Sequence, residues 1–220
     1  MKLSKILTIS LLIVGIAFSS GCTTGSYYWN KLFPVDSGQA IYWDDFSDSS
    51  SGWETWNHNG AGVAYETGGL RFMVHEQYFD QWSRPGQIFD DLKVEVLSTK
   101  LSGPDNNNFG LICRYQDDKN FYAFLISSDG YHGIIKATEG HYEIISGGEL
   151  RYSEVVLQGD APNYLQAECV GDQLSFFVNG EMMSNVQDSD FSKGDVGLFA
   201  GTYEGSSVDI LFDNFVVYAP

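Results

Sequence analysis

The chain has 220 residues, of which 43% are hydrophobic and 15% aromatic, and its formal net charge is −17. This apolar content is sufficient for a large folded core and excludes an intrinsically disordered chain. The acidic balance predicts repulsion of nucleic-acid phosphates and anionic lipid headgroups, so we expect neither as a direct partner, and it favours divalent cations wherever carboxylates converge.

Residues 1–21 predict an export signal. Two early lysines precede an apolar run over residues 6–18, which is shorter than the roughly 20 residues that a membrane-spanning helix requires. Small residues then lead to Cys22 and resemble a lipobox, although Ser19 stands where such motifs prefer Leu. We expect cleavage after residue 21 and lipidation of Cys22, which would anchor the protein in the cell envelope outside the cytoplasm. An ordinary secretory signal and a retained anchor are the alternatives.

Residues 22–40 are expected to form the lipidated cysteine and a spacer. The segment contains Pro34 and Gly38 and has no regular periodicity, yet it is richer in aromatic residues than a pure tether. We expect these aromatic residues to dock on the following domain or on a partner.

Residues 41–220 predict one domain of successive β-strands. Short runs rich in β-branched and aromatic residues are separated by Gly, Asn, Asp and Ser, and several of them alternate apolar with polar residues. In the run LKVEVLS, Leu92, Val94 and Val96 share one face. About a dozen such strands call for an all-β sandwich of two packed antiparallel sheets, with a closed barrel as the alternative.

The three cysteines divide into two groups. If Cys22 carries lipid, Cys113 and Cys169 remain as a pair, and each lies in a strand-like segment. An oxidising compartment would allow a disulfide between them. Two buried free thiols are an equally good interpretation, because the sequence does not show whether the two Cα atoms come close enough.

The strand phrases from DDFSDSSSGW through FGLICRYQDDKNFYAFLISSDGYHGI and LQAECVGDQLSFFVNG to VDILFDNFVVY resemble the concanavalin A-like lectin and glucanase jelly rolls, and more narrowly the laminin-G-like modules of bacterial lipoproteins. The resemblance covers residues 41–220. It implies a jelly-roll sandwich with one concave sheet, whose face and rim loops bind sugars in many members and hydrolyse them in some.

No catalytic residues are predicted. Glucanases of this fold carry Glu-x-Asp-x-x-Glu on one strand, and the nearest segment here, FDDLKVEV, places Lys93 between Asp91 and Glu95. No Gly-x-Ser-x-Gly or His-Glu-x-x-His motif is present. The four histidines lie in scattered segments. Enzymatic activity is therefore not the favoured function, although one fold hosts several functions.

Candidate ligand-binding residues come from loop segments, where exposed aromatic rings stack on sugars and polar groups fix the hydroxyls. They are Trp82, Arg84, Tyr131, His132 and Tyr203. Packing in a core or turn is the alternative for each one separately.

A structural calcium ion is also implied by the resemblance, at the meeting point of the first and last strands. The matching residues are Asp44 or Asp45 and Asp213, with the segment 105–108 as an alternative cluster. Turn formation is the simpler role for such residues.

We therefore expect a binding module that recognises a glycan or a cell-envelope protein without catalysis. A glycoside hydrolase with an atypical carboxylate pair and a purely structural envelope protein are the alternatives. The membrane would be reached only through the N-terminal lipid.

Overall fold

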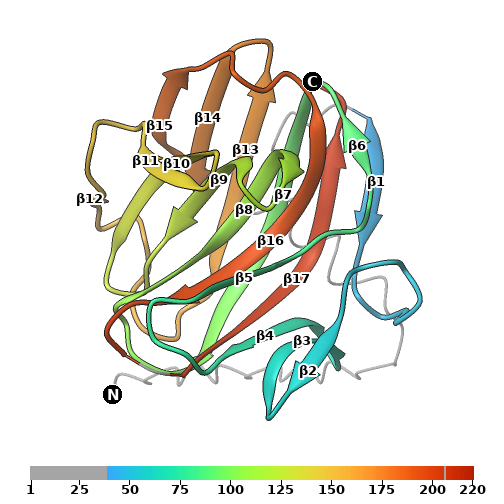
Figure 1. Cartoon of the computed structure of the whole chain (residues 1–220), viewed down its shortest axis with the longest axis vertical. Helices are drawn as coiled ribbons and strands as arrows, with labels where there is room; N and C mark the ends of the chain where they lie inside the picture. Colours follow the sequence, from blue (N-terminus) through green and yellow to red (C-terminus); the bar gives the residue numbers. More distant parts are fainter. Residues whose placement is uncertain (1–38, 206) are drawn as a thin grey trace, which may run out of the picture. The chain divides into compact units, whose positions relative to one another are not determined.

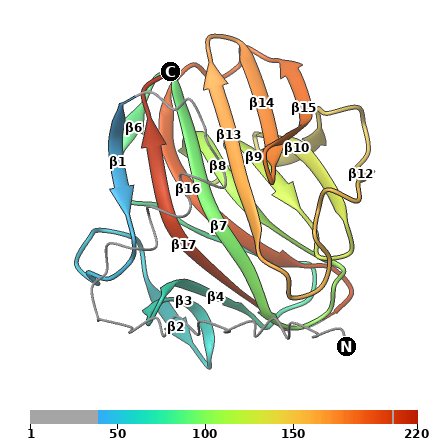
Figure 2. The same ribbon diagram turned by 180° about the vertical axis from the view of Figure 1, so that it is seen from behind.

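The computed structural model describes residues 39–205 and 207–220. The predicted signal peptide, Cys22 and the spacer up to residue 38 lie outside this part of the chain. The described residues form two antiparallel β-sheets that pack against each other (Figures 1 and 2). The predicted all-β jelly-roll sandwich is confirmed, and the barrel alternative is wrong because the strands divide into two separate sheets.

The first sheet, which we call sheet A, has the order β15-β14-β13-β7-β17-β4-β3-β2 among the described residues, and β1 pairs with β17. Neighbours in this order are often far apart in sequence, as β7 and β17 are. The strands of sheet A are β1 (Ala40–Asp44), β2 (Trp56–His58), β3 (Ala61–Glu66), β4 (Gly69–Val74), β7 (Leu92–Ser102), β13 (Asn163–Val170), β14 (Gln173–Val178), β15 (Glu181–Gln187) and β17 (Val208–Tyr218).

The second sheet, sheet B, has the order β11-β10-β9-β8-β16-β5 in the described part, with β12 paired to β10 and β6 paired to β16. Its strands are β5 (Asp80–Ser83), β6 (Ile88–Phe89), β8 (Asn107–Asp117), β9 (Asn120–Ile126), β10 (Tyr131–Thr138), β11 (His141–Ile144), β12 (Arg151–Tyr152) and β16 (Gly194–Thr202).

The main core lies between the sheets and follows the alternation in the sequence. Leu92, Val94 and Val96 of β7 are fully buried, as their spacing predicts. Sheet B contributes residues such as Phe124 and Ile126 of β9 to the same cluster. Burial of such side chains contributes about 1.5–3 kcal/mol each to stability.

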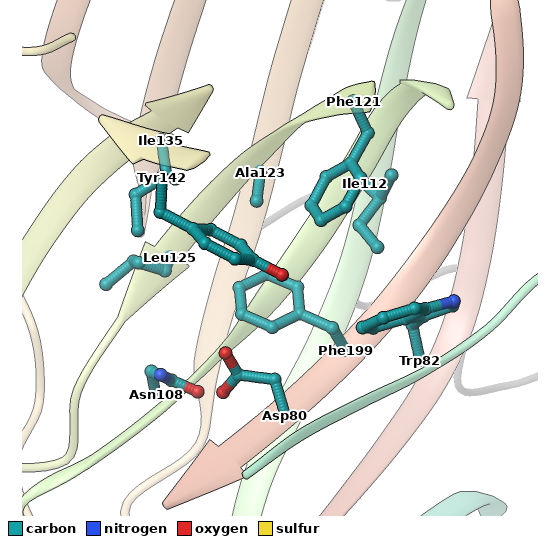
Figure 3. A pocket seen from close by; sticks show the side chains of 10 residues that line it. All are labelled: Asp80, Trp82, Asn108, Ile112, Phe121, Ala123, Leu125, Ile135, Tyr142 and Phe199. Atoms are coloured by element: carbon teal, nitrogen blue, oxygen red, sulfur yellow. The ribbon is translucent and has the colours of Figure 1, made fainter. Parts of the chain in front are cut away.

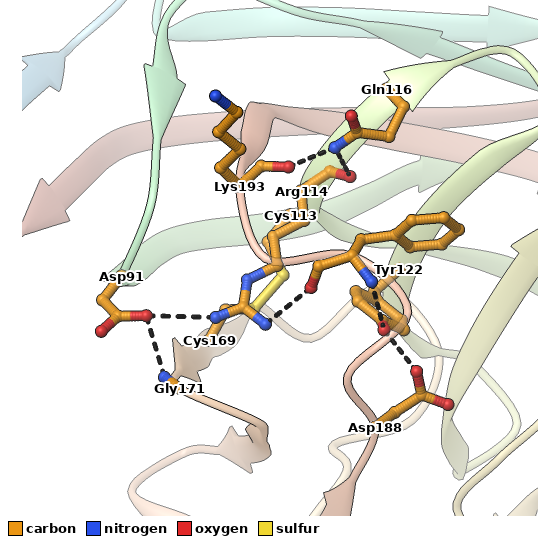
Figure 4. The surroundings of a disulfide bond; sticks show 10 residues. Asp91, Cys113, Arg114, Gln116, Tyr122, Cys169, Gly171, Asp188 and Lys193 are labelled. Atoms are coloured by element: carbon orange, nitrogen blue, oxygen red, sulfur yellow. Dashed lines mark hydrogen bonds and ion pairs between the residues drawn. A yellow bond between two sulfur atoms is a disulfide. The ribbon is translucent and has the colours of Figure 1, made fainter.

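A disulfide between Cys113 of β8 and Cys169 of β13 crosses this core and joins the two sheets (Figure 4). Both cysteines are fully buried. The structure thus holds the pair in the bridged form, one of the two alternatives that the sequence left open. The bridge closes a loop with a sequence separation of 56 residues, for which the chain-entropy model predicts a stabilisation of about 4 kcal/mol.

Arg114, the residue after Cys113, fixes the end of β8. Its backbone φ is 53°, at an irregularity in the pairing of β8 with β9. The fully buried side chain donates to the carbonyl oxygen of Phe191 over 2.9 Å and forms an ion pair of 3.2 Å with Asp91. Asp91 also accepts a hydrogen bond from the Gly171 amide (Figure 4). The buried guanidinium therefore has partners from two separate segments.

Within the described residues, no helix is long and apolar enough to cross a membrane.

Candidate functional site

The face of sheet B that points away from sheet A has small residues at its centre. Because side chains alternate along a strand, these positions share a face with Ile112, Phe121 and Phe199, which belong to a second apolar cluster. Leu150 packs on this cluster from outside the sheet. The small residues on this face are Gly110, Ala123, Gly133, Ala137 and Gly201. Of these, Ala123 lines a hollow, whereas the space beside Gly133 is filled by Leu150 and the space beside Gly201 by Asp80 and Asn108.

One hollow, which we call the aromatic pocket, has about 350 Å³ of free space including its open mouth (Figure 3). Its enclosed part is about 30 Å³, which accommodates a small chemical group and not a whole sugar ring. Its floor and walls come from six strands of sheet B, and the residues that line it are Asp80, Trp82, Asn108, Ile112, Phe121, Ala123, Leu125, Ile135, Tyr142 and Phe199.

Aromatic rings form the walls of this pocket. The rings of Trp82 and Phe121 have centroids 5.9 Å apart, and those of Phe121 and Tyr142 are 6.1 Å apart in an edge-to-face arrangement. Phe121 is buried, whereas Tyr142 keeps 54% of its surface exposed. The Tyr142 ring is therefore accessible to a ligand, and its contact with the buried Phe121 holds it in place.

The polar end of the pocket is built around Gly201. In the strand register, Gly201 of β16 is the partner of Asp80 on β5 and of Asn108 on β8. A methyl group added at Gly201 would lie 1.7 Å from Asp80 Oδ1 and 2.4 Å from Asn108 Oδ1. Because Gly201 has no side chain, the oxygens of Asp80 and Asn108 can both lie over this position (Figure 3).

Burial raises the pKa of Asp80 above its ordinary value, and the neighbouring Asn108 amide partly opposes this shift. Asn108 is only 6% exposed, and its Oδ1 has no hydrogen-bond partner among the described residues. Burial also raises the pKa of Tyr142, with smaller contributions from the charges of Asp80 and Asp118. The half-buried Asp80 carboxylate and the buried Asn108 oxygen therefore meet here, and the Asn108 oxygen has no donor among the described residues.

A second, wider hollow lies beside the first, and we call it the tyrosine hollow. It is lined by Tyr78, Asn106, Ser127, Asp129, Tyr131, Ile144, Leu150, Tyr203 and Glu204. Burial raises the pKa of Tyr203; the Asn108 amide opposes this shift, and the charges of Asp80 and Asp129 add to it. Asn108 and Leu150 therefore connect the two hollows, since Leu150 also packs on the cluster under the aromatic pocket.

The structure separates the five predicted ligand residues. Trp82 lines the aromatic pocket, and Tyr131 and Tyr203 line the tyrosine hollow. Arg84 lines neither: its guanidinium pairs with Glu54 over 2.8 Å and lies 4.0 Å from the centre of the Tyr115 ring.

His132, also predicted as a ligand contact, lines neither hollow. His132 is only 4% exposed, because adjacent residues of β10 point to opposite faces and Tyr131 takes the outward one. Burial lowers the pKa of His132, and the charge of Arg151 adds to this shift.

Asp80 and Tyr142 were not predicted, and Asn108 was named only as part of the alternative calcium segment. Asp80 and Asn108 meet only because both flank Gly201, and this pairing joins three strands that are distant in sequence. The available signal was the alternation of small and large residues in FGLIC, NFYAFLI and GLFAGT, which marks a hollowed outer face on neighbouring strands.

The predicted calcium residues lie at the junction of β1 and β17. Burial raises the pKa of Asp213, and the charge of nearby Asp45 adds to this shift, with an opposing hydrogen bond from the Asn214 amide. No group of three or more His, Cys, Asp or Glu side chains is placed to hold a metal in the described part of the chain. A calcium ion here would need backbone carbonyls and water to complete its six to eight ligands.

The alternative calcium segment 105–108 is already occupied by a positive charge. The ammonium of Lys100 forms ion pairs with Asp105 and, over 3.1 Å, with Asp160. Asn107 is held by Pro104 and Ser128. The side-chain oxygens of Asp105 and Asn107 therefore serve the loop itself.

The charged residues of the segment FDDLKVEV, which was compared with the glucanase motif, also form structural contacts. Asp91 pairs with Arg114, and Lys93 pairs with Glu168 over 3.3 Å. Glu95 is buried and accepts a hydrogen bond from the Tyr164 hydroxyl. Of the described residues that line the aromatic pocket, Asp80 alone carries a carboxylate, whereas glycoside hydrolysis commonly uses two.

No family model matches the chain, and no curated protein matches it. Its fold is similar to that of carbohydrate-binding module CBM66 from Bacillus subtilis, with a TM-score of 0.62, 20% identity, and coverage of 76% of this chain and 96% of that one. A Bacillus subtilis protein of unknown function with a galectin-like fold aligns with a TM-score of 0.61, 12% identity, and coverage of 83% and 97%.

A chain described under endo-acting O-glycanases of human gut bacteria aligns with a TM-score of 0.60, 10% identity, and coverage of 83% of this chain and 100% of that one. At such identities the likeness concerns the fold. The chain is a β-sandwich, and these solved structures share its fold.

Proposed function

We propose that this protein is a glycan-binding module without catalysis, held in the cell envelope by a lipid on Cys22. The observation that carries the proposal is the aromatic pocket on the outer face of sheet B, which combines accessible aromatic rings with one half-buried carboxylate. Its position on the same face as the tyrosine hollow suits a ligand longer than one sugar ring.

The pocket suits a sugar in two respects. Trp82 and Tyr142 provide rings on which the apolar face of a pyranose stacks. Asp80 and Asn108 provide oxygens that accept hydrogen bonds from hydroxyl or amino groups. Tyr131 and Tyr203 would extend the contact into the tyrosine hollow.

The structural neighbours support a glycan rather than another small molecule. One of them is a carbohydrate-binding module, and another is described as a glycan-cleaving enzyme. A laminin-G-like module on a lipoprotein is the narrower form of this proposal. A cell-envelope protein as the partner, in a structural role, is the competing proposal.

Hydrolysis is a second candidate, favoured by the raised pKa of Asp80, which is a property of general acids. The tyrosine hollow holds the nearest further carboxylates, Asp129 and Glu204. Release of reducing sugar that the Asp80→Asn substitution eliminates would establish this activity and contradict the proposal of binding without catalysis.

The test is binding of the purified chain to an array of bacterial and plant glycans, with calcium and with a chelator. We expect saturable binding to one glycan class, unchanged in the chelator unless the Asp45 and Asp213 region holds a calcium ion that supports the fold. No binding in either condition, from a sample with cooperative unfolding, would contradict the glycan proposal and direct the search to a protein partner.

A further inference from the structure

The charges of the two hollows bear on which glycan can bind. Among the described residues that line them, three carry acidic side chains, namely Asp80, Asp129 and Glu204, and none is Lys, Arg or His. The nearest arginine in sequence to Trp82, Arg84, is already paired with Glu54 and Asp195. Sugars with carboxylate or sulfate groups would therefore meet repulsion without a partner charge.

A single hydroxyl group cannot donate to both acceptor oxygens at the polar end of the aromatic pocket. Asp80 Oδ1 and Asn108 Oδ1 both lean over Gly201 and both accept hydrogen bonds. The Asn108 oxygen is buried and has no partner in the described structure. A sugar hydroxyl carries one hydrogen and satisfies one of these oxygens, whereas an ammonium group carries three and satisfies both.

The walls of the pocket also suit a cation. Trp82, Phe121, Tyr142 and Phe199 present aromatic surface around the space in front of Asp80 (Figure 3). The faces of aromatic rings attract ammonium groups, and the attraction increases when water is excluded. A carboxylate within an aromatic enclosure pairs with such a group at short range, and the net charge of −17 attracts it from a distance.

We propose that the aromatic pocket binds a positively charged amine carried by a sugar residue, so that the ligand is a glycan with free amino groups. This inference rests on the proposed function for the position of the ligand and adds its chemical class. The shared chemistry is the protonated primary amine, which an amino sugar or a small primary ammonium compound can supply. The adjoining tyrosine hollow favours the sugar, because it offers further contact surface that a small cation would leave unused.

The experiment compares two glycans with the same backbone, using the purified full chain in detergent and titration calorimetry. One probe is a glucosamine hexamer with free amines, and the other is the fully N-acetylated hexamer. Measurements are made at a pH where the amines are charged. We expect the charged hexamer to bind at least tenfold more tightly, and the Asp80→Asn variant to lose this preference.

Two further variants distinguish the effect of the Asp80 charge from the effect of the free space at Gly201. Asp172→Asn removes the same charge from an exposed turn between β13 and β14 and is expected to keep the preference. Gly201→Ala places a methyl group against both oxygens and is expected to weaken binding of the charged hexamer by tenfold or more. Cooperative thermal unfolding of each variant shows that its fold is intact.

The outcomes distinguish the two proposals. Equal binding of both hexamers, with unchanged preference in Asp80→Asn, would overturn the amine inference and leave the glycan proposal standing. Tight binding of methylammonium without binding of either hexamer would support the cation pocket and contradict the glycan proposal. Failure of all three probes to bind the folded chain would overturn the amine inference.

Discussion

On β9, Phe124 and Ile126 face sheet A and are fully buried in the main core, whereas Ala123 faces the other way and lines an open pocket. The two faces of sheet B thus use the same strands in different ways. The inward face is filled by side chains from a second sheet. The outward face is covered only by loops and single rings, and its small residues leave room for a ligand. The same strands of sheet B therefore contribute to the stability of the core on one face and to the candidate site on the other.

The largest expected effect concerns the inward face. Replacing both Cys113 and Cys169 by Ser removes the link between the sheets, and we expect the free energy of unfolding to fall by about 4 kcal/mol. Urea unfolding of the oxidised chain measures this loss. Cys22→Ser is the matched control, since it removes the remaining cysteine and is expected to leave unfolding unchanged. Equal stability of the double variant and the native chain would contradict a stabilising role.

The next effect concerns the outward face. Trp82→Ala removes one aromatic wall, and we expect glycan affinity to fall by about tenfold or more, because a buried aromatic contact commonly contributes over 1 kcal/mol. Trp43→Ala is the control, since Trp43 is exposed on β1 of sheet A. Glycan titration measures both. If the two variants bind alike, Trp82 does not form part of the site.

The sequence predicts the inward face of the sandwich better than the outward face. The inward positions follow from alternation alone, so Leu92, Val94 and Val96 were assigned correctly. The outward pocket depends on which strands become neighbours, and a single sequence does not give that order. Trp82 was predicted from a segment expected to be a loop, and the structure places it on β5, where it lines the pocket. Asp80 was not predicted, because its partner Asn108 lies across Gly201 on another strand.

A smaller effect concerns how the stability of the fold depends on pH through the Asp80 carboxylate on the outward face. Burial raises the pKa of Asp80 above its unfolded value, so the ionised carboxylate destabilises the folded state. This cost is fully present above the folded pKa and disappears as the pH falls below the ordinary pKa of Asp. We expect Asp80→Asn to raise the Tm at pH 7 by roughly 2–4 °C, equivalent to about 1 kcal/mol.

The check is thermal unfolding of native and Asp80→Asn chains from pH 7 down to pH 3. The difference in Tm should shrink as the pH falls. Asp172→Asn, on an exposed turn, should show no such trend. A constant difference across this range would mean that the substitution acts through packing and not through the charge.

The smallest expected effect lies away from both faces, at the junction of β1 and β17. A cation between Asp45 and Asp213 would offset the repulsion that contributes to the raised pKa of Asp213. We expect calcium to raise the Tm by a few degrees and Asp213→Asn to abolish the increase. Thermal unfolding with calcium, magnesium and chelator measures it, and an identical Tm in all three would exclude this site.

The alternation along β8 has a consequence for how the site responds to a ligand. Cys113 points inward into the disulfide, while Asn108 and Ile112 point outward into the aromatic pocket. The floor of the pocket is therefore attached to a strand that is cross-linked to the opposite sheet and held at its end by Arg114. Such a floor is preorganised: little conformational entropy remains to be lost when a ligand binds, so more of the contact energy is available as affinity.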